Sequence, residues 1–144
     1  MWITFATTDN INDISMVELE CFEKQAWSKD MIASNFNNHN KYLICQTDDD
    51  EIIGYLSFLE LDIECELLRL AVRKKFRKQG HAKALMEFFI DYCVEHKKEK
   101  IFLEVNSQNF NAIKLYESLN FEPISVRKNY YGENEDAINY IKLL

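Results

Sequence analysis

The stretch between residues 65 and 106 constrains the fold of this 144-residue chain more than any other part of it. An apolar run, Leu67 to Val72, leads through a basic turn containing Gly80 into a helical pattern. The run from Ile101 to Asn106 then has the composition of a second strand. Strand, helix and strand in this order predict a right-handed crossover between parallel neighbours. The sequence therefore predicts an α/β fold with a parallel strand pair.

The other strands are expected to be antiparallel and joined by hairpins. Asp13 is expected to cap the first helix, whose apolar positions are Ile14, Val17, Leu19 and Phe22. Ser28 is expected to cap the second helix. The expected strands are 2–6, 41–47, 51–61, 65–72, 101–106, 121–130 and 137–143, and the helices are 13–24, 29–36, 109–119 and one from Ala82 to about His96. With no break in composition, residues 1–144 are expected to form one domain.

Composition and charge exclude several classes of protein. The chain is 47% hydrophobic with only 3 Gly and 1 Pro, which is typical of a folded domain. It has no apolar run of about 18 residues and no secretory signal, so we expect a cytoplasmic protein without a membrane interaction. The net charge of −7 argues against direct nucleic-acid binding and suits a basic partner.

The cysteines and histidines indicate no metal centre. Cys21, Cys45, Cys65 and Cys93 are scattered without a C-x-x-C pair, as expected for reduced thiols. The three histidines have no ligand spacing, so no metal is predicted. No cysteine is expected at a helix start beside a basic partner, which argues against a cysteine acyl-enzyme.

The basic turn has the features of a phosphate-binding site. Backbone N–H groups at a helix start are unpaired, and the helix dipole favours negative charge there. Gly80 and the small Ala82 allow a ligand to approach this backbone closely. The alternative is an ordinary solvated loop.

Two further side chains suggest proton transfer. Glu104 lies mid-strand, and a carboxylate inside a sheet with both faces covered is costly unless it faces a cavity. Such a group suits a general base, whereas on an edge strand it would be an ordinary solvated residue. Tyr116 lies on the apolar side of the next helix, where a core aromatic is the alternative. A phenol of pKa about 10 can protonate a departing thiolate of pKa about 8.5.

The spacing Arg77-x-x-Gly80-x-Ala82 resembles the phosphate-binding signature of the GCN5-related N-acetyltransferase (GNAT) family. Further segments resemble its bacterial ribosomal-protein-alanine N-acetyltransferase branch, and together they extend the resemblance over nearly the whole chain. These segments are Trp27-Ser28, Leu103–Phe121, Arg127–Tyr131 and Glu135–Ala137. The chain departs from the usual pattern at Ala26, Arg69, Ala82 and Asn120.

The resemblance implies a mixed, mostly antiparallel GNAT-type sheet with a splayed parallel strand pair and flanking helices. It also implies acetyl-CoA as co-substrate and direct transfer to the N-terminal alanine of small-subunit ribosomal protein number eighteen. The partner would be this basic protein, and the enzyme a monomer or weak dimer. The alternatives are a broad N-terminal acetyltransferase, a small-amine or lysine acetyltransferase, and a non-catalytic acyl-CoA-binding module.

The resemblance also implies a role for each site residue. Glu104 would accept the proton of the amine and Tyr116 would donate one to coenzyme A. The substrate side would include Trp27, Arg69, Tyr130 and Tyr131, with ordinary strand packing the alternative for at least one of the two adjacent tyrosines. The cofactor would contact Leu70, Ala71, Val72, Arg77, Lys78, Gln79, Gly80, His81, Ala82, Lys83 and Asn109, with backbone N–H groups near Val72 polarising the thioester carbonyl.

Overall fold

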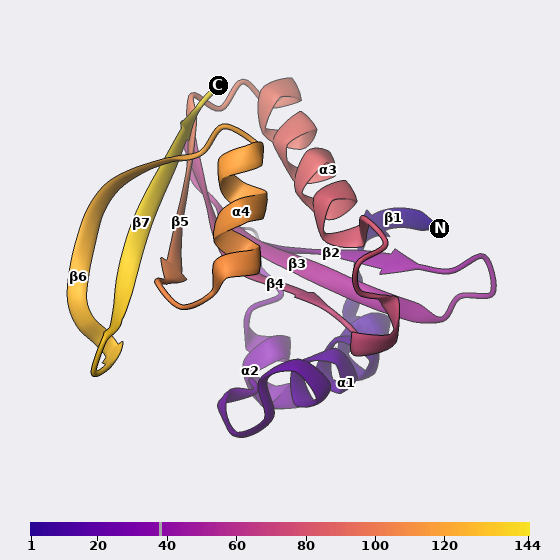
Figure 1. Cartoon of the computed structure of the whole chain (residues 1–144). Coiled ribbons are helices and arrows are strands. Elements are labelled where there is room, and N and C mark those ends of the chain that lie inside the picture. The colour runs from indigo at the N-terminus through magenta and orange to yellow at the C-terminus, as the bar shows by residue number, and fades with distance from the viewer. Residues whose placement is uncertain (38) are drawn as a thin grey trace.

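The protein, a computed structural model that describes residues 1–37 and 39–144, is built on a seven-stranded sheet (Figure 1). The strands are β1 (Trp2–Phe5), β2 (Asn40–Gln46), β3 (Ile52–Glu60), β4 (Glu64–Val72), β5 (Lys100–Asn106), β6 (Glu122–Gly132) and β7 (Glu135–Leu143). The α-helices are α1 (Ile11–Phe22), α2 (Lys29–Ser34), α3 (His81–Glu95) and α4 (Phe110–Ser118). This order of strands and α-helices along the chain confirms the predicted one.

The sheet is mixed, as predicted, with strand order β1-β2-β3-β4-β5-β7-β6. All neighbours pair antiparallel except β4 and β5, which are parallel and joined by the crossover through α3. The β4–β5 register covers only Glu64–Glu66 opposite Lys100–Phe102. Beyond these residues the two strands separate, which gives the splayed pair that the family resemblance implied.

Two hydrophobic clusters occupy the two faces of the sheet. Helices α1 and α2 lie on one face, here called the α1/α2 face, where Ile14, Val17 and Ile32 pack against Tyr55 and other sheet residues. Helices α3 and α4 cover the opposite face, here called the α3/α4 face. The α1/α2 face is covered over β2, β3 and β4, whereas β5, β7 and β6 extend beyond the two helices (Figure 1).

The caps of the first two helices differ in how well the sequence predicts them. The helix α1 begins at Ile11, not after Asp13, because Thr7 and Asn10 form a capping box around a preceding 3₁₀ turn. Ser28 caps α2 as predicted, since its hydroxyl accepts a hydrogen bond from the Met31 N–H, but the helix ends at Ser34 instead of Phe36.

The buried side of α1 contains an acid. Leu19, expected on the apolar side, is 61% exposed, whereas the side chain of Glu18 is completely buried. Ile14 and Glu18 are four residues apart and share one side of the helix, while Leu19 is rotated away from it. The helix therefore turns a carboxylate toward the sheet.

Among residues 1–37 and 39–144, no helix is both long and apolar enough to cross a membrane.

Candidate active site

The gap between β4 and β5 leaves one edge of β4 open. Pairing with β3 continues along β4 as far as Val72, but pairing with β5 ends at Glu66. In the described part of the chain, the β5-side backbone groups of residues 67–72 have no strand partner. Gly54 allows β3 to approach closely here, because a Cβ at this position would lie 2.3 Å from the Ala71 carbonyl oxygen. Leu70, Ala71 and Val72, the predicted cofactor contacts, thus lie on an edge without a strand partner, where the Val72 carbonyl oxygen is already occupied by side chains.

The basic turn is held in shape by its own residues. Arg77 Nε donates a hydrogen bond to the Val72 carbonyl oxygen at 2.8 Å, which ties the turn to the end of β4. Lys78 and Gly80 both have positive φ angles, 62° and 85°, in the left-handed region. Gln79 Nε2 donates to the Lys75 carbonyl oxygen at 3.3 Å. The side chains of Arg77 and Gln79 therefore contribute to the loop's shape.

The start of α3 fits an anionic ligand. Helical bonding begins with the Ala84 N–H donating to the Gly80 carbonyl oxygen, so the N–H groups of residues 81–83 precede the first helical hydrogen bond. Lys78 is exposed in the turn and Lys83 in the first turn of the helix. The His81 Nδ1 atom is buried and has no hydrogen-bond partner within the described residues. These groups match the needs of a diphosphate.

Glu104 lies on β5 and points toward the α1/α2 face. Its Oε2 atom is 3.4 Å from Arg127 Nε, and its Oε1 atom accepts a hydrogen bond from the Tyr131 hydroxyl at 3.4 Å. The side chain is 23% exposed, so solvent and an incoming ligand can reach it. The expectation that both faces of β5 are covered is wrong, because a hollow flanks β5 on the α1/α2 face.

Tyr130 and Tyr131 form an exposed aromatic pair beside Glu104. Their ring centroids are 5.1 Å apart with the planes nearly perpendicular, and Arg127 lies 5.0 Å from the Tyr130 centroid. The side chains are 55% and 45% exposed, respectively. Ordinary strand packing is therefore not observed for either tyrosine.

Tyr116 approaches the β4–β5 gap from the opposite side of the sheet. It is buried in the cluster that contains Val72, Leu103 and Val105. Burial raises its pKa to about 12, so the phenol is protonated at neutral pH. Because side chains alternate along a strand, Glu104 points away from the face that Leu103 and Val105 share with Tyr116. The candidate base and acid thus flank β5 from its two faces.

Arg69 and Trp27 meet at the edge of α1, together with an acid that sequence reasoning missed. Arg69 binds Glu18 through two hydrogen bonds, Nε to Oε1 at 3.0 Å and a terminal nitrogen to Oε2 at 3.1 Å. Its guanidinium carbon lies 4.0 Å from the centroid of the Phe22 ring and 4.3 Å from that of Trp27. The backbone N–H of Trp27 donates a hydrogen bond to Glu18 Oε2 at 2.9 Å.

The Glu18 carboxylate also accepts a hydrogen bond from the Tyr55 hydroxyl. This network fixes the segment between α1 and α2 against β4. The i, i+4 spacing from Ile14 was the sequence signal that could have placed Glu18 on the buried side.

Asn109 and Cys21 have neighbours that the sequence did not predict. The Asn109 side-chain oxygen accepts a hydrogen bond from the Ala112 N–H and caps α4, while its contact with the cofactor stays a prediction. Cys21 lies 3.5 Å from an Arg77 nitrogen, but it is in the last turn of α1 and not at a helix start. Burial nevertheless raises the pKa of Cys21, and it raises that of Cys45 to about 11. Neither thiol is an activated nucleophile.

Residues 8–121 match the model of the acetyltransferase (GNAT) family. The chain therefore belongs to the GNAT acetyltransferases, enzymes that use acetyl-CoA. The open edge of β4 and the N-terminus of α3 fit that co-substrate.

Curated relatives include the [ribosomal protein bS18]-alanine N-acetyltransferase of Haemophilus ducreyi, 37% identical over 117 residues, which are 78% of this chain and 79% of the relative. An N-alpha-acetyltransferase of Saccharolobus solfataricus is 39% identical over 102 residues, 62% of this chain and 61% of that protein.

Solved structures agree with the fold. The ribosomal-protein-S18-alanine N-acetyltransferase of Escherichia coli superposes with a TM-score of 0.91 and 27% identity, covering 99% of this chain and 92% of that one. An aminoglycoside 6'-N-acetyltransferase complexed with coenzyme A superposes with a TM-score of 0.86 at 16% identity, over 99% of this chain and 97% of that chain. The second likeness extends to the fold alone.

Proposed function

We propose that this chain is a protein N-α-acetyltransferase that transfers acetyl from acetyl-CoA to the N-terminal alanine of ribosomal protein bS18 in the cytoplasm. Relatives that carry this description support the choice of acceptor. The observation that carries the chemistry is the placement of Glu104 and Tyr116 on opposite faces of β5, beside the open edge of β4. The net charge of −7 suits a basic protein acceptor.

In the proposed reaction, coenzyme A supplies the acetyl group as a thioester. Backbone N–H groups near Val72 hold the carbonyl oxygen and stabilise the negative charge that develops on it. Glu104 takes a proton from the acceptor ammonium, through a water molecule, so that the free amine attacks. The new N–C bond forms as the C–S bond breaks, and the Tyr116 hydroxyl donates its proton to the sulfur. The attacking nitrogen loses its second proton to water, and water returns a proton to Tyr116. Glu104 then releases its own proton to solvent, and no covalent enzyme intermediate is required.

Arg127 and Tyr131 would prepare Glu104 for this role. In the structure both hold the carboxylate at its two oxygens. The acceptor ammonium carries the same charge as Arg127 and would replace its guanidinium at Oε2. Arg127 is 58% exposed, so its side chain can move into solvent without a large desolvation cost.

A broader N-terminal acetyltransferase is the second candidate. The archaeal relative, described as an N-alpha-acetyltransferase, supports it. The exposed Tyr130–Tyr131 pair also supports it, because an open wall places few limits on the first residue of a peptide. Acetylation of a small amine or a lysine, and acyl-CoA binding without turnover, are the remaining alternatives.

The test is mass-spectrometric acetylation, with acetyl-CoA, of short peptides that differ only in their first residue. An N-terminally blocked peptide that contains lysine serves as the control substrate. We expect α-amine acetylation of the Ala-first bS18-type peptide and none of the blocked control. Equal rates on many first residues would favour the broader enzyme, whereas labelling of the blocked lysine would exclude N-terminal specificity.

Variants separate catalysis from cofactor binding. Glu104→Gln is expected to lower kcat by about 10²- to 10⁴-fold, the usual contribution of a general base, while coenzyme A binds as in the wild type. Glu95→Gln, an exposed change at the end of α3, is the matched control and should keep full activity. Wild-type protein that binds coenzyme A but acetylates no amine would leave only the binding-module alternative.

A further inference from the structure

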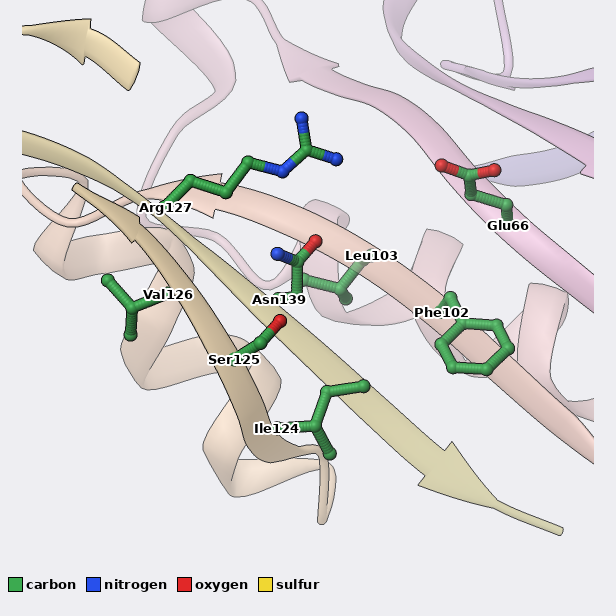
Figure 2. Close-up of a pocket in the computed structure, with 8 residues that line it drawn as sticks. All are labelled: Glu66, Phe102, Leu103, Ile124, Ser125, Val126, Arg127 and Asn139. Carbon is green, nitrogen blue, oxygen red and sulfur yellow. The ribbon is translucent and has the colours of Figure 1, made fainter. Parts of the chain in front are cut away.

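A hollow of about 410 Å³ lies on the α1/α2 face, past the edge of the two helices (Figure 2). Its walls come from β4, β5, β7 and β6. Glu66 stands on the β4 side, Phe102 rises from β5, and Ile124 and Arg127 come from β6. None of these lining residues except Arg127 has a part in the proposed chemistry.

The hollow lies next to the candidate base. Phe102 and Glu104 are two positions apart on β5 and point to the same face, so their Cα atoms are separated by about 7 Å. In the sheet register, Glu104 is opposite Asn139, a lining residue, and Phe102 is opposite Glu66. A peptide whose amine lies at Glu104 reaches the hollow with the side chain of one of its next two residues, since an extended chain advances about 3.3 Å per residue.

One acid in this region, Glu66, has no charged partner among the described residues. Arg127 is paired with Glu104, so these two side chains neutralise each other. Glu66 is exposed and makes no ion pair or side-chain hydrogen bond with any described residue. In Figure 2 its carboxylate and the Arg127 guanidinium are turned toward the space between them from opposite sides. Glu104, Arg127 and Glu66 together carry one net negative charge. Lys100 is a further cation at this wall, with its Nζ atom 5.6 Å from the centroid of the Phe102 ring, and it forms no ion pair with Glu66.

The lower walls of the hollow are apolar. The Phe102 ring and the Ile124 side chain approach each other from β5 and β6, and Ile124 is 54% exposed although it is a large aliphatic residue. An aliphatic stem can pack between them while a polar end reaches upward to Glu66. Lysine and arginine have this combination of an apolar stem and a cationic end.

We propose that this hollow is a specificity site for a lysine or arginine side chain at the second or third residue of the acceptor peptide, with Glu66 as the group that recognises the cation. The inference rests on the proposed N-terminal acetyltransferase function and deepens it. Phe102 and Ile124 hold the stem, and Glu66 forms an ion pair with the charged end. Glu66 touches neither the reacting amine nor the acetyl group and acts on acceptor choice alone.

The experiment compares Ala-first peptides with lysine, methionine or glutamate at the second or third position. Methionine keeps an unbranched stem without the charge. In the wild type we expect kcat/KM of the better lysine peptide to exceed that of its methionine partner about five-fold, the effect of a partly exposed ion pair. In Glu66→Gln this ratio should fall to about one, and in Glu66→Lys the glutamate peptide should become preferred. Kinetics of the methionine peptide should change little in Glu66→Gln.

Glu95→Gln removes the same charge on the other side of the sheet and should keep the wild-type preference for lysine. Titration calorimetry of the same peptides, with coenzyme A present, gives a second measurement that does not need turnover. If the protein binds the lysine peptide preferentially, loses this preference in Glu66→Gln, and acetylates none of the peptides, the proposed function is refuted but the specificity site is retained. Binding or acetylation that ignores the charge, or a preference that persists in Glu66→Gln, would overturn the site. Acetylation of the small amine spermidine, together with no detectable binding of any of the peptides, would also overturn the proposed specificity site.

Discussion

Replacing Arg69 by methionine tests the buried ion pair between β4 and α1. Methionine keeps much of the stem's volume but leaves the completely buried Glu18 carboxylate without its cation. Breaking a buried pair by removing one partner costs about 3–5 kcal/mol. Arg69 is 19% exposed, which favours the lower end of that range, whereas lost stacking on Phe22 and Trp27 adds about 0.5–1 kcal/mol. The expected loss in unfolding free energy is therefore about 3–4 kcal/mol.

This loss corresponds to a large change in melting temperature. For 144 residues the unfolding entropy near 60 °C is about 0.3 kcal/mol/K, so the midpoint should fall by about 10 °C. Urea unfolding followed by circular dichroism at pH 7 measures the free energy directly. Arg127→Met is the matched control, because that arginine is 58% exposed and its ion pair should contribute less than about 0.5 kcal/mol.

A double variant completes the test. Glu18→Gln with Arg69→Met removes both charges, so it should be more stable than the two single losses added together predict. A loss below about 1 kcal/mol in Arg69→Met, or strict additivity in the double variant, would refute the idea that Arg69 neutralises a buried charge.

Three further outcomes follow from the same geometry. Tyr116→Phe should lower kcat about 10²-fold or more, with the affinity for coenzyme A unchanged in calorimetry; an unaltered kcat would exclude Tyr116 as the acid. Because burial raises the pKa of Tyr116 to about 12, above the unfolded value of about 10, folding favours the protonated phenol. Its contribution to stability should be complete below about pH 10 and should be lost as the pH rises toward 12, and alkaline unfolding curves of Tyr116→Phe should be flatter there. Gly54→Ala should destabilise the protein by about 1–3 kcal/mol in urea unfolding, because its Cβ would lie 2.3 Å from the Ala71 carbonyl oxygen; wild-type stability would show that β3 relaxes freely.

The parts of the fold that the sequence predicted are those set by local patterns. Hydrophobic periodicity and the crossover rule were enough for the strand and helix order, and a polar cap residue placed Ser28 correctly. The start of α1 was missed because two side chains upstream, Thr7 and Asn10, cap a 3₁₀ turn that extends the helical segment. Side-chain polarity alone predicted that Leu19 is buried and did not predict the burial of Glu18. That burial depends on Arg69, which is 51 residues away in the chain.

The candidate site shows the same limit. The alternation of side chains along β5 correctly predicted that Glu104 and Leu103 lie on opposite faces of the strand. Gly80 has the positive φ angle that glycine adopts most readily. The contacts of Arg127 and Tyr131 with Glu104 depend on the course of β6, whose register with β7 is irregular between Arg127 and Gly132. The surroundings of Glu66 are formed by three other strands, so no local pattern distinguishes it from a solvated acid.

Because β4 and β5 pair over a short stretch, the sheet consists of two parts, here called leaves, that are joined by a few backbone hydrogen bonds, here called the seam. Strands β1 to β4 form one leaf and β5 to β7 the other, and the seam consists of three residue pairs. A molecule that hydrogen-bonds to both strands across the opening forms a second connection between the two leaves. Its binding then raises the free energy needed to separate them. We therefore expect a ligand in the gap to slow amide exchange on strands far from it, such as β1 or β6.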